Sequence, residues 1–185
     1  MLSHWQKDNT SIMSEPPRIA ILFVCLGNIC RSPLAEGVFR TVLQERGLEH
    51  LFQIDSAALG DWHVGQPPDP RSVAAARRNG IDTSGQTCRQ VGPEDFERFD
   101  LIFGMDRDNI RRLSRLAPKE PCGRIHLFRQ YALDRAEEVP DPYHGGEEGF
   151  DAVYRMIREA SEALADKLAD RALSVRNSGQ ASSTT

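Results

Sequence analysis

Residues 18–34 read RIAILFVCLGNICRSPL, and this stretch decides the fold. Its first part, residues 18–24, is a short run rich in Ile and Val, which is typical of a strand buried on both faces. Pro33 suits the first position of a helix, and Gly47 suits the residue just beyond the end of one. The stretch therefore predicts a strand, a tight loop that begins at Cys25, and a helix.

The rest of the chain repeats this order of strand and helix. Short apolar runs predict further strands at 52–57, 100–105 and 125–128. Helical patterns follow these strands, at 69–80, 106–116 and 147–172. Strands separated by helices favour a parallel sheet with right-handed crossovers. We therefore predict a single α/β domain over residues 18–172.

The composition is that of an ordinary soluble globular protein. Of 185 residues, 39% are hydrophobic and 27% charged, and the net charge of −4 favours neither nucleic acid nor an anionic membrane as a partner. Residues 1–17 are polar and end in Pro-Pro, so we expect a disordered extension there and a flexible tail at 173–185. The longest apolar run, residues 19–26, is too short to cross a bilayer, and a cytoplasmic location is expected.

The chain has four cysteines, Cys25, Cys30, Cys88 and Cys122. Thiols of cytosolic proteins stay reduced, so a disulfide scaffold is not expected. Cys88 and Cys122 are isolated and lack the paired spacing of a zinc site. We expect no metal and no other cofactor, and the cysteines are interpreted as reactive or buried thiols.

The loop after the first strand has the features of an anion site. Cys25 and Arg31 bracket five residues at the carboxyl end of a strand, where open parallel sheets bind ligands. The helix that follows offers free N–H groups and the positive end of its dipole, and a curled loop can add its own N–H groups. Gly27 and Asn28 tolerate the left-handed backbone angles of such a curl. The planar fork of Arg31 can grip two phosphate oxygens at once.

The same loop predicts a reactive thiolate. Loop N–H groups, the helix dipole and Arg31 all favour the thiolate of Cys25, which can then attack phosphorus in line. Ser32 follows directly, and its hydroxyl can hydrogen-bond the sulfur. The alternative is a buried cysteine at a strand end, which is a common fate of a single cysteine. The strand-to-helix context favours the catalytic interpretation.

The stretch FVCLGNICRSPLAE resembles the active-site loop of the low-molecular-weight protein tyrosine phosphatases nearly residue for residue. Shorter matching pieces occur in the family's order at 55–58, 65–69, 89–90, 103–106 and 139–143, so the resemblance covers residues 18–170. It implies a four-stranded parallel sheet with helices on both faces and a phosphate loop after the first strand. The implied activity is hydrolysis of phosphotyrosine in proteins through a cysteinyl-phosphate intermediate.

The resemblance also implies roles for single residues. Asp141, in Val-Pro-Asp-Pro-Tyr, matches the general acid, and the same group later activates water. The aromatic walls of the substrate slot match Trp62 and Tyr143, which are otherwise ordinary, partly buried aromatics. Asn28, Ser32 and Ser56 match one hydrogen-bond network, to which many relatives add a His where this chain has Gln86. The residues implied to surround the phosphate are Leu26, Gly27, Asn28, Ile29, Cys30 and Ser32.

In the family, a cysteine at the position of Cys30 can form a disulfide with the nucleophile and protect it from over-oxidation. A thiolate beside a second cysteine is the arrangement expected of a reversible redox switch. The alternative is that Cys30 is a small packing residue.

Three other functions remain open. An arsenate reductase of the same fold needs two further, closely spaced cysteines, which Cys88 and Cys122 do not supply. A protein-arginine phosphatase carries Thr at the position of Ile29, whose larger apolar side chain suits a flat ring. A non-catalytic phosphate-binding module would lack Cys25 or Asp141. The expected partners are a phosphotyrosine-bearing protein and, in the loop, phosphate or another oxyanion.

Overall fold

The structure is a computed structural model that describes residues 19–119 and 124–180, with only the backbone described for 174–180. One sheet contains the four strands β1 (Ile19–Cys25), β2 (Phe52–Ala58), β3 (Leu101–Gly104) and β4 (Arg124–Leu127). The strand order is β2-β1-β3-β4, and all three neighbouring pairs are parallel. The predicted four-stranded parallel sheet is confirmed.

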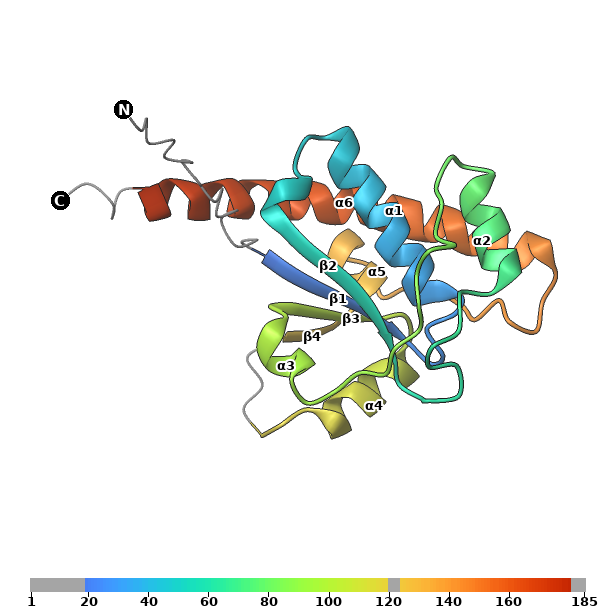
Figure 1. The fold of residues 1–185 in the computed structure, drawn as a ribbon. Helices are drawn as coiled ribbons and strands as arrows, with labels where there is room; N and C mark the ends of the chain where they lie inside the picture. The colour runs from blue at the N-terminus through green and yellow to red at the C-terminus, as the bar shows by residue number, and fades with distance from the viewer. Residues whose placement is uncertain (1–18, 120–123, 181–185) are drawn as a thin grey trace, which may run out of the picture.

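Alternation along β1 divides the core into two layers. Ile21 and Phe23 point to one face, while Leu22 and Val24 point to the other, and all four are fully buried. The first face is covered by α1 (Arg31–Glu45), α5 (Phe128–Leu133) and α6 (Glu147–Gln180). The second face is covered by α3 (Asp95–Arg98) and α4 (Arg107–Leu116). Figure 1 shows α1 and α6 above the sheet and α3 and α4 below it, so the predicted helices on both faces are confirmed.

The residues that predict helix ends lie near the ends of helices in the structure, but α1 begins earlier than expected. α2 (Pro70–Arg77), which packs on α1 and α6, opens with Asp69 as N-cap, and the left-handed Gly80 follows its end. α1, however, begins at Arg31, so Pro33 is its third residue and not its first. Proline fits there because the N–H groups of the whole first turn have no acceptor within the helix.

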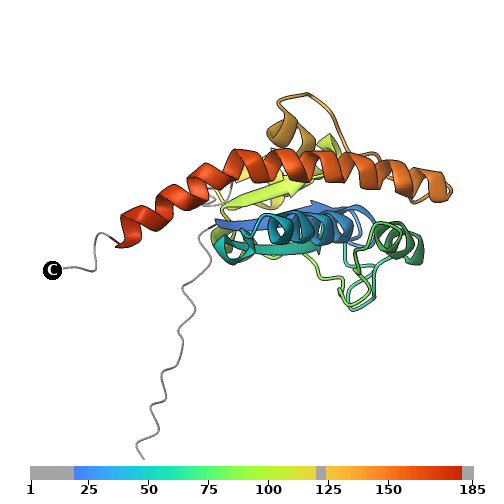
Figure 2. The ribbon, with the colours of Figure 1, turned by 90° about the horizontal axis from the view of Figure 1, so that it is seen from above.

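The last helix is longer than the range 147–172 that the sequence predicts. α6 continues to Gln180, eight residues past the predicted end, and no proline or glycine occurs in residues 150–178. Figure 2 shows α6 running past the whole sheet. The short helices α3, α5 and η1 (Glu49–Leu51) were not predicted, since so few residues show no helical period.

Some predictions fall outside the described residues, namely the extension 1–17, the tail beyond 180 and Cys122. Within residues 19–119 and 124–180, no helix is both long and apolar enough to cross a bilayer.

Candidate active site

The loop of residues 26–30 connects β1 to α1 at the carboxyl edge of the sheet. Asn28 takes the left-handed conformation, with φ of 52°. Gly27, which was expected to share it, does not have a positive φ. Its lack of a side chain serves a close approach instead, because a Cβ there would lie 3.1 Å from Cδ2 of His63. The first turn of α1 follows the loop directly, so its free N–H groups lie at the site.

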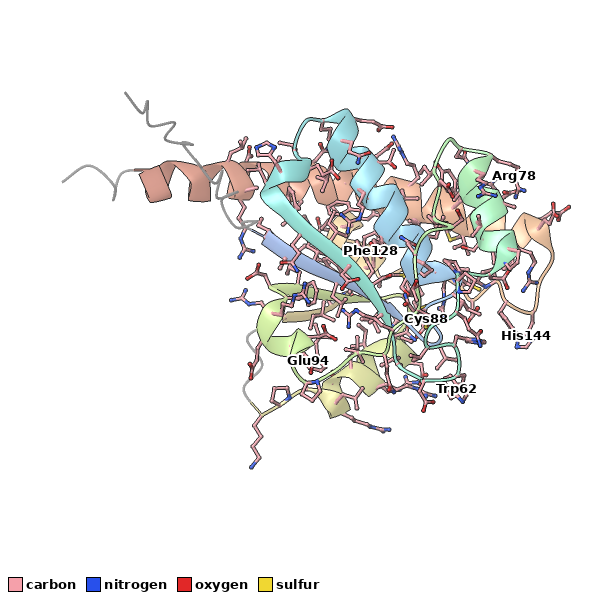
Figure 3. The ribbon with its side chains drawn as sticks, viewed as in Figure 1. Trp62, Arg78, Cys88, Glu94, Phe128 and His144 are labelled. Atoms are coloured by element: carbon pink, nitrogen blue, oxygen red, sulfur yellow. The ribbon has the colours of Figure 1, made fainter. Side chains whose placement is uncertain are left out.

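A pocket of about 240 Å³ opens at this loop, with the buried Cys25 in its lining. The sulfur of Cys25 lies 3.1 Å from Oγ of Ser32, within hydrogen-bond distance. Figure 3 shows Trp62 and His144 on separate loops at the same end of the molecule. The pocket is lined by Cys25, Leu26, Gly27, Ile29, Cys30, Arg31, Trp62, His63, Asp141, Tyr143 and His144.

Arg31 links the loop to two carboxylates from distant parts of the chain. Its Nη1 donates to Asp106 Oδ2 at 2.6 Å and to the Val139 carbonyl at 3.1 Å, while Nη2 donates to Asp141 Oδ2 at 2.9 Å. The residue is only 2% exposed. Burial alone would lower the pKa of Arg31, but the negative charges of Cys25, Asp106 and Asp141 outweigh it and raise that pKa. The guanidinium is therefore a permanent, oriented positive charge at the site.

Asp106 belongs to a matching piece of the family resemblance, but the sequence assigned it no role beyond that of a possible helix N-cap. One of its oxygens accepts from the N–H of Asn109 at 2.7 Å and so caps α4, while the other holds Arg31. The available signal was its position, because Asp106 follows the end of β3 and therefore lies at the same sheet edge as the phosphate loop.

Asp141 lies between Pro140 and Pro142 and reaches the pocket from the segment before α6. Its Oδ1 accepts the N–H of Tyr143 at 3.1 Å, and Oδ2 accepts from Arg31. The side chain is 43% exposed, so it is open to solvent on one side and can exchange protons there. The acid candidate and the nucleophile candidate therefore line one pocket.

The two predicted aromatic walls both line this pocket. Trp62 is 62% exposed and Tyr143 is 43% exposed, so both rings lie at the rim and not in the core. The ring of Trp62 folds back over Gly60, where a Cβ would lie 1.8 Å from the ring, so this glycine is required for the placement of Trp62. Two rim residues that were not predicted are His63 and His144.

Below the loop, the three residues expected in one hydrogen-bond network are brought together. Nδ2 of Asn28 donates to Oγ of Ser32 at 2.9 Å and to Oγ of Ser56 at 3.0 Å. All three side chains are buried. Because Ser32 also contacts the sulfur of Cys25, the network extends directly to the candidate nucleophile.

The network ends on Glu36, which was not predicted. Oγ of Ser56 donates to its Oε2 at 2.7 Å, and Arg40 pairs with its Oε1 at 3.1 Å. Burial raises the pKa of Glu36, and the bonds from Ser56 and Arg40 oppose that rise. Gln86 does not close the network, since its buried Oε1 has no hydrogen-bond partner among the described residues. The signal for Glu36 was an i, i+4 ion pair on a helix whose neighbouring positions are apolar.

Three free cysteines lie at the loop. Burial raises the pKa of Cys30 far above its ordinary value, and the negative charges of Asp69 and Cys25 add smaller contributions in the same direction. This side chain therefore stays a thiol at neutral pH. Cys88 donates its S–H to the carbonyl of Gly27 at 3.2 Å. Burial, followed by the charge of Cys25, also raises the pKa of Cys88.

Residues 20–174 match the sequence model of the low molecular weight phosphotyrosine protein phosphatases. The chain belongs to this family. A low molecular weight phosphotyrosine protein phosphatase of Schizosaccharomyces pombe is 43% identical over 153 residues, which cover 82% of this chain and 97% of that protein.

Solved structures agree with this membership. A protein tyrosine phosphatase of Entamoeba histolytica, with Hepes in its active site, superposes with a TM-score of 0.77 at 38% identity, covering 82% of this chain and 97% of that one. An arginine phosphatase of Drosophila superposes with a TM-score of 0.74 at 34% identity, covering 80% and 96%. A tyrosine phosphatase and an arginine phosphatase thus both superpose on this chain. The shared fold fixes the position of the loop, but it does not by itself decide which phosphorylated side chain is the substrate.

Proposed function

We propose that this phosphatase hydrolyses phosphotyrosine in proteins, with Cys25 as nucleophile, Arg31 as phosphate clamp and Asp141 as general acid and base. The observation that carries the proposal is the convergence of these three residues on one pocket, with Asp141 held 2.9 Å from the Arg31 fork. Family membership supports the same assignment.

In the first step, the thiolate of Cys25 attacks phosphorus while the bond between phosphorus and the phenolic oxygen breaks. The leaving oxygen takes the electron pair of that bond, and Asp141 gives it a proton. Loop N–H groups and Arg31 bind the three equatorial oxygens, whose charge is spread in the transition state. The products of this step are the free tyrosine and a phosphate bonded to the sulfur.

In the second step, water replaces the sulfur. Asp141, now a carboxylate, takes a proton from the water as its oxygen attacks phosphorus, and the electron pair of the S–P bond returns to Cys25. The hydroxyl of Ser32, 3.1 Å from the sulfur, stabilises the departing thiolate. Inorganic phosphate then leaves the loop.

Arg31 is bonded to Asp141 as well as to Asp106. An entering phosphate dianion competes with Asp141 for Nη2, because both are anions that fit the same donor. Asp106 keeps its bond to Nη1 throughout and holds the fork in place. Substrate binding therefore releases Asp141 for its role as acid.

The rim favours a flat aromatic group as substrate. Ile29 presents an apolar side chain to the pocket, and the rings of Trp62 and Tyr143 stand at its mouth. We expect kcat/KM for a phosphotyrosyl peptide to exceed that for the matching phosphoarginyl peptide by at least ~100-fold. Ile29→Thr should reduce this ratio about tenfold, since it replaces apolar surface by a hydroxyl that suits a guanidinium. Phosphate release from both peptides measures the ratio.

Two outcomes would contradict this substrate class. If the unmodified chain prefers the phosphoarginyl peptide, the protein is a protein-arginine phosphatase. If neither peptide is hydrolysed while inorganic phosphate still binds, the protein is a non-catalytic phosphate-binding module. The proposal also requires a reducing compartment such as the cytoplasm, because an oxidised Cys25 cannot attack phosphorus.

We also propose that Cys30 is the redox partner of Cys25. Peroxide oxidises the thiolate of Cys25 to a sulfenic acid, and the thiol of Cys30 attacks that sulfur, which forms the disulfide and releases water. We expect peptide mass spectrometry after brief peroxide treatment to show a linkage between residues 25 and 30, with activity restored by a thiol reductant. Sulfinic acid on Cys25 without that linkage would contradict the assignment.

A further inference from the structure

Arg71, the second residue of α2, joins several parts of the molecule near the pocket. Its Nε and Nη2 donate to the two carboxylate oxygens of Asp69 at 3.0 and 2.8 Å, and its Nη1 donates to the carbonyl of Gly145 at 3.1 Å. The guanidinium carbon lies 5.5 Å from the ring centre of Tyr143 and 4.7 Å from that of Phe150. The guanidinium therefore donates hydrogen bonds from its edges and contacts aromatic rings with its face.

The base from which Arg71 extends is fixed to the phosphate loop. The N–H of Asp69 donates to the carbonyl of Ile29 at 2.8 Å, and Oγ of Ser72 donates to the carbonyl of Cys30 at 2.9 Å. The first turn of α2 is thus bonded to two successive residues of the loop. The bidentate pair with Asp69 therefore holds the side chain of Arg71 in a fixed position relative to the phosphate loop.

The segment that Arg71 grips carries the general acid. Residues 140–146, here called the acid loop, are mostly exposed and contain two adjacent glycines, Gly145 and Gly146. Glycine leaves the backbone many conformations, so a productive position of this loop needs external contacts. The bond from Arg31 to Asp141 is the one that an entering phosphate displaces, whereas the contacts of Arg71 with Tyr143 and Gly145 do not compete with phosphate.

We propose that Arg71 is a positioning residue for the general acid: it holds the acid loop against the start of α2 and so places Asp141 beside the leaving oxygen. This inference rests on the proposed role of Asp141. A lysine cannot replace the guanidinium, because an ammonium lacks the fork for Asp69 and the flat face for the rings.

The dependence of rate on the leaving group tests this role. A phenolate that leaves poorly needs the acid, whereas p-nitrophenolate leaves with little help. For Arg71→Met, which keeps the apolar stem but no donor, we expect kcat/KM to fall about tenfold with phenyl phosphate and only about twofold with p-nitrophenyl phosphate, because the acid is misplaced. Arg71→Lys should show the same pattern.

The matched control is Arg78→Ala. Arg78, the C-cap residue of α2 that is labelled in Figure 3, bonds to α6, with its Nε 3.2 Å from Asp151. Arg78→Ala therefore removes an arginine ion pair near α2 that involves neither Asp69 nor the acid loop. We expect both substrates to be hydrolysed as by the unmodified protein, and the melting temperatures of the Arg71 and Arg78 variants to be similar.

An equal fall with both substrates in Arg71→Met would overturn the positioning role and leave a general structural one. No fall with either substrate would overturn it as well. In an Asp141→Asn background, Arg71→Met should add no further leaving-group dependence. If Asp141→Asn itself leaves that dependence unchanged, the proposed acid is wrong; if it raises the dependence and Arg71→Met does not, only the role of Arg71 is wrong.

Discussion

Replacement of Cys25 by serine is expected to lower kcat/KM for a phosphotyrosyl peptide by at least ~10⁴-fold. A serine hydroxyl is a far weaker nucleophile than a cysteine sulfur, so the first step of the reaction should become very slow. Arg31 and the N–H groups of the loop remain, so inorganic phosphate should still bind. Steady-state hydrolysis and calorimetric phosphate binding measure the two effects separately.

Cys88→Ser is the control for this substitution. Cys88 is also buried and bonded to the phosphate loop, and a serine hydroxyl can keep its bond to the carbonyl of Gly27. We expect this variant to keep at least about a tenth of the activity. Comparable losses for Cys25→Ser and Cys88→Ser would show that the loop tolerates no cysteine change, and Cys25 would not be the nucleophile.

The second large effect is expected for Asp141→Asn. The amide is nearly isosteric but cannot give up a proton, so kcat/KM with phenyl phosphate should fall by ~10²- to 10³-fold. The loss should be smaller with p-nitrophenyl phosphate, whose leaving group needs less help. The limb of the pH profile that reports the acid should also disappear, which a series of rate measurements across pH detects.

Asp108→Asn provides the matched control for the acid. Asp108 is an exposed carboxylate on α4 that pairs with Arg111 and Arg112, outside the pocket. Its neutralisation should leave both rates and the pH profile as they are. An Asp141→Asn variant that behaves like Asp108→Asn would assign the proton to another group at the rim.

The order of strands and helices, and the loop between β1 and α1, could be predicted from the sequence because their signals are local. A buried strand shows as a run of Ile and Val, and proline and glycine mark the ends of helices within a few residues. Cys25 and Arg31 lie at the two ends of one short loop, so their spacing alone brings them together. Resemblance to a family added Asp141, Trp62 and Tyr143, for which the pattern of residues alone gave only a loop and two aromatics.

Tertiary structure alone decided which charged residues support that loop. Arg31 meets Asp106 from 75 residues away and Asp141 from 110 residues away, and no local pattern encodes either encounter. Glu36 and Arg71 have ordinary sequence surroundings, and they matter because of what the fold places against them: Ser56 in one case and the acid loop in the other. Backbone conformation follows from neighbouring residues, whereas a charge acts on whatever the folded chain brings within a few ångströms of it.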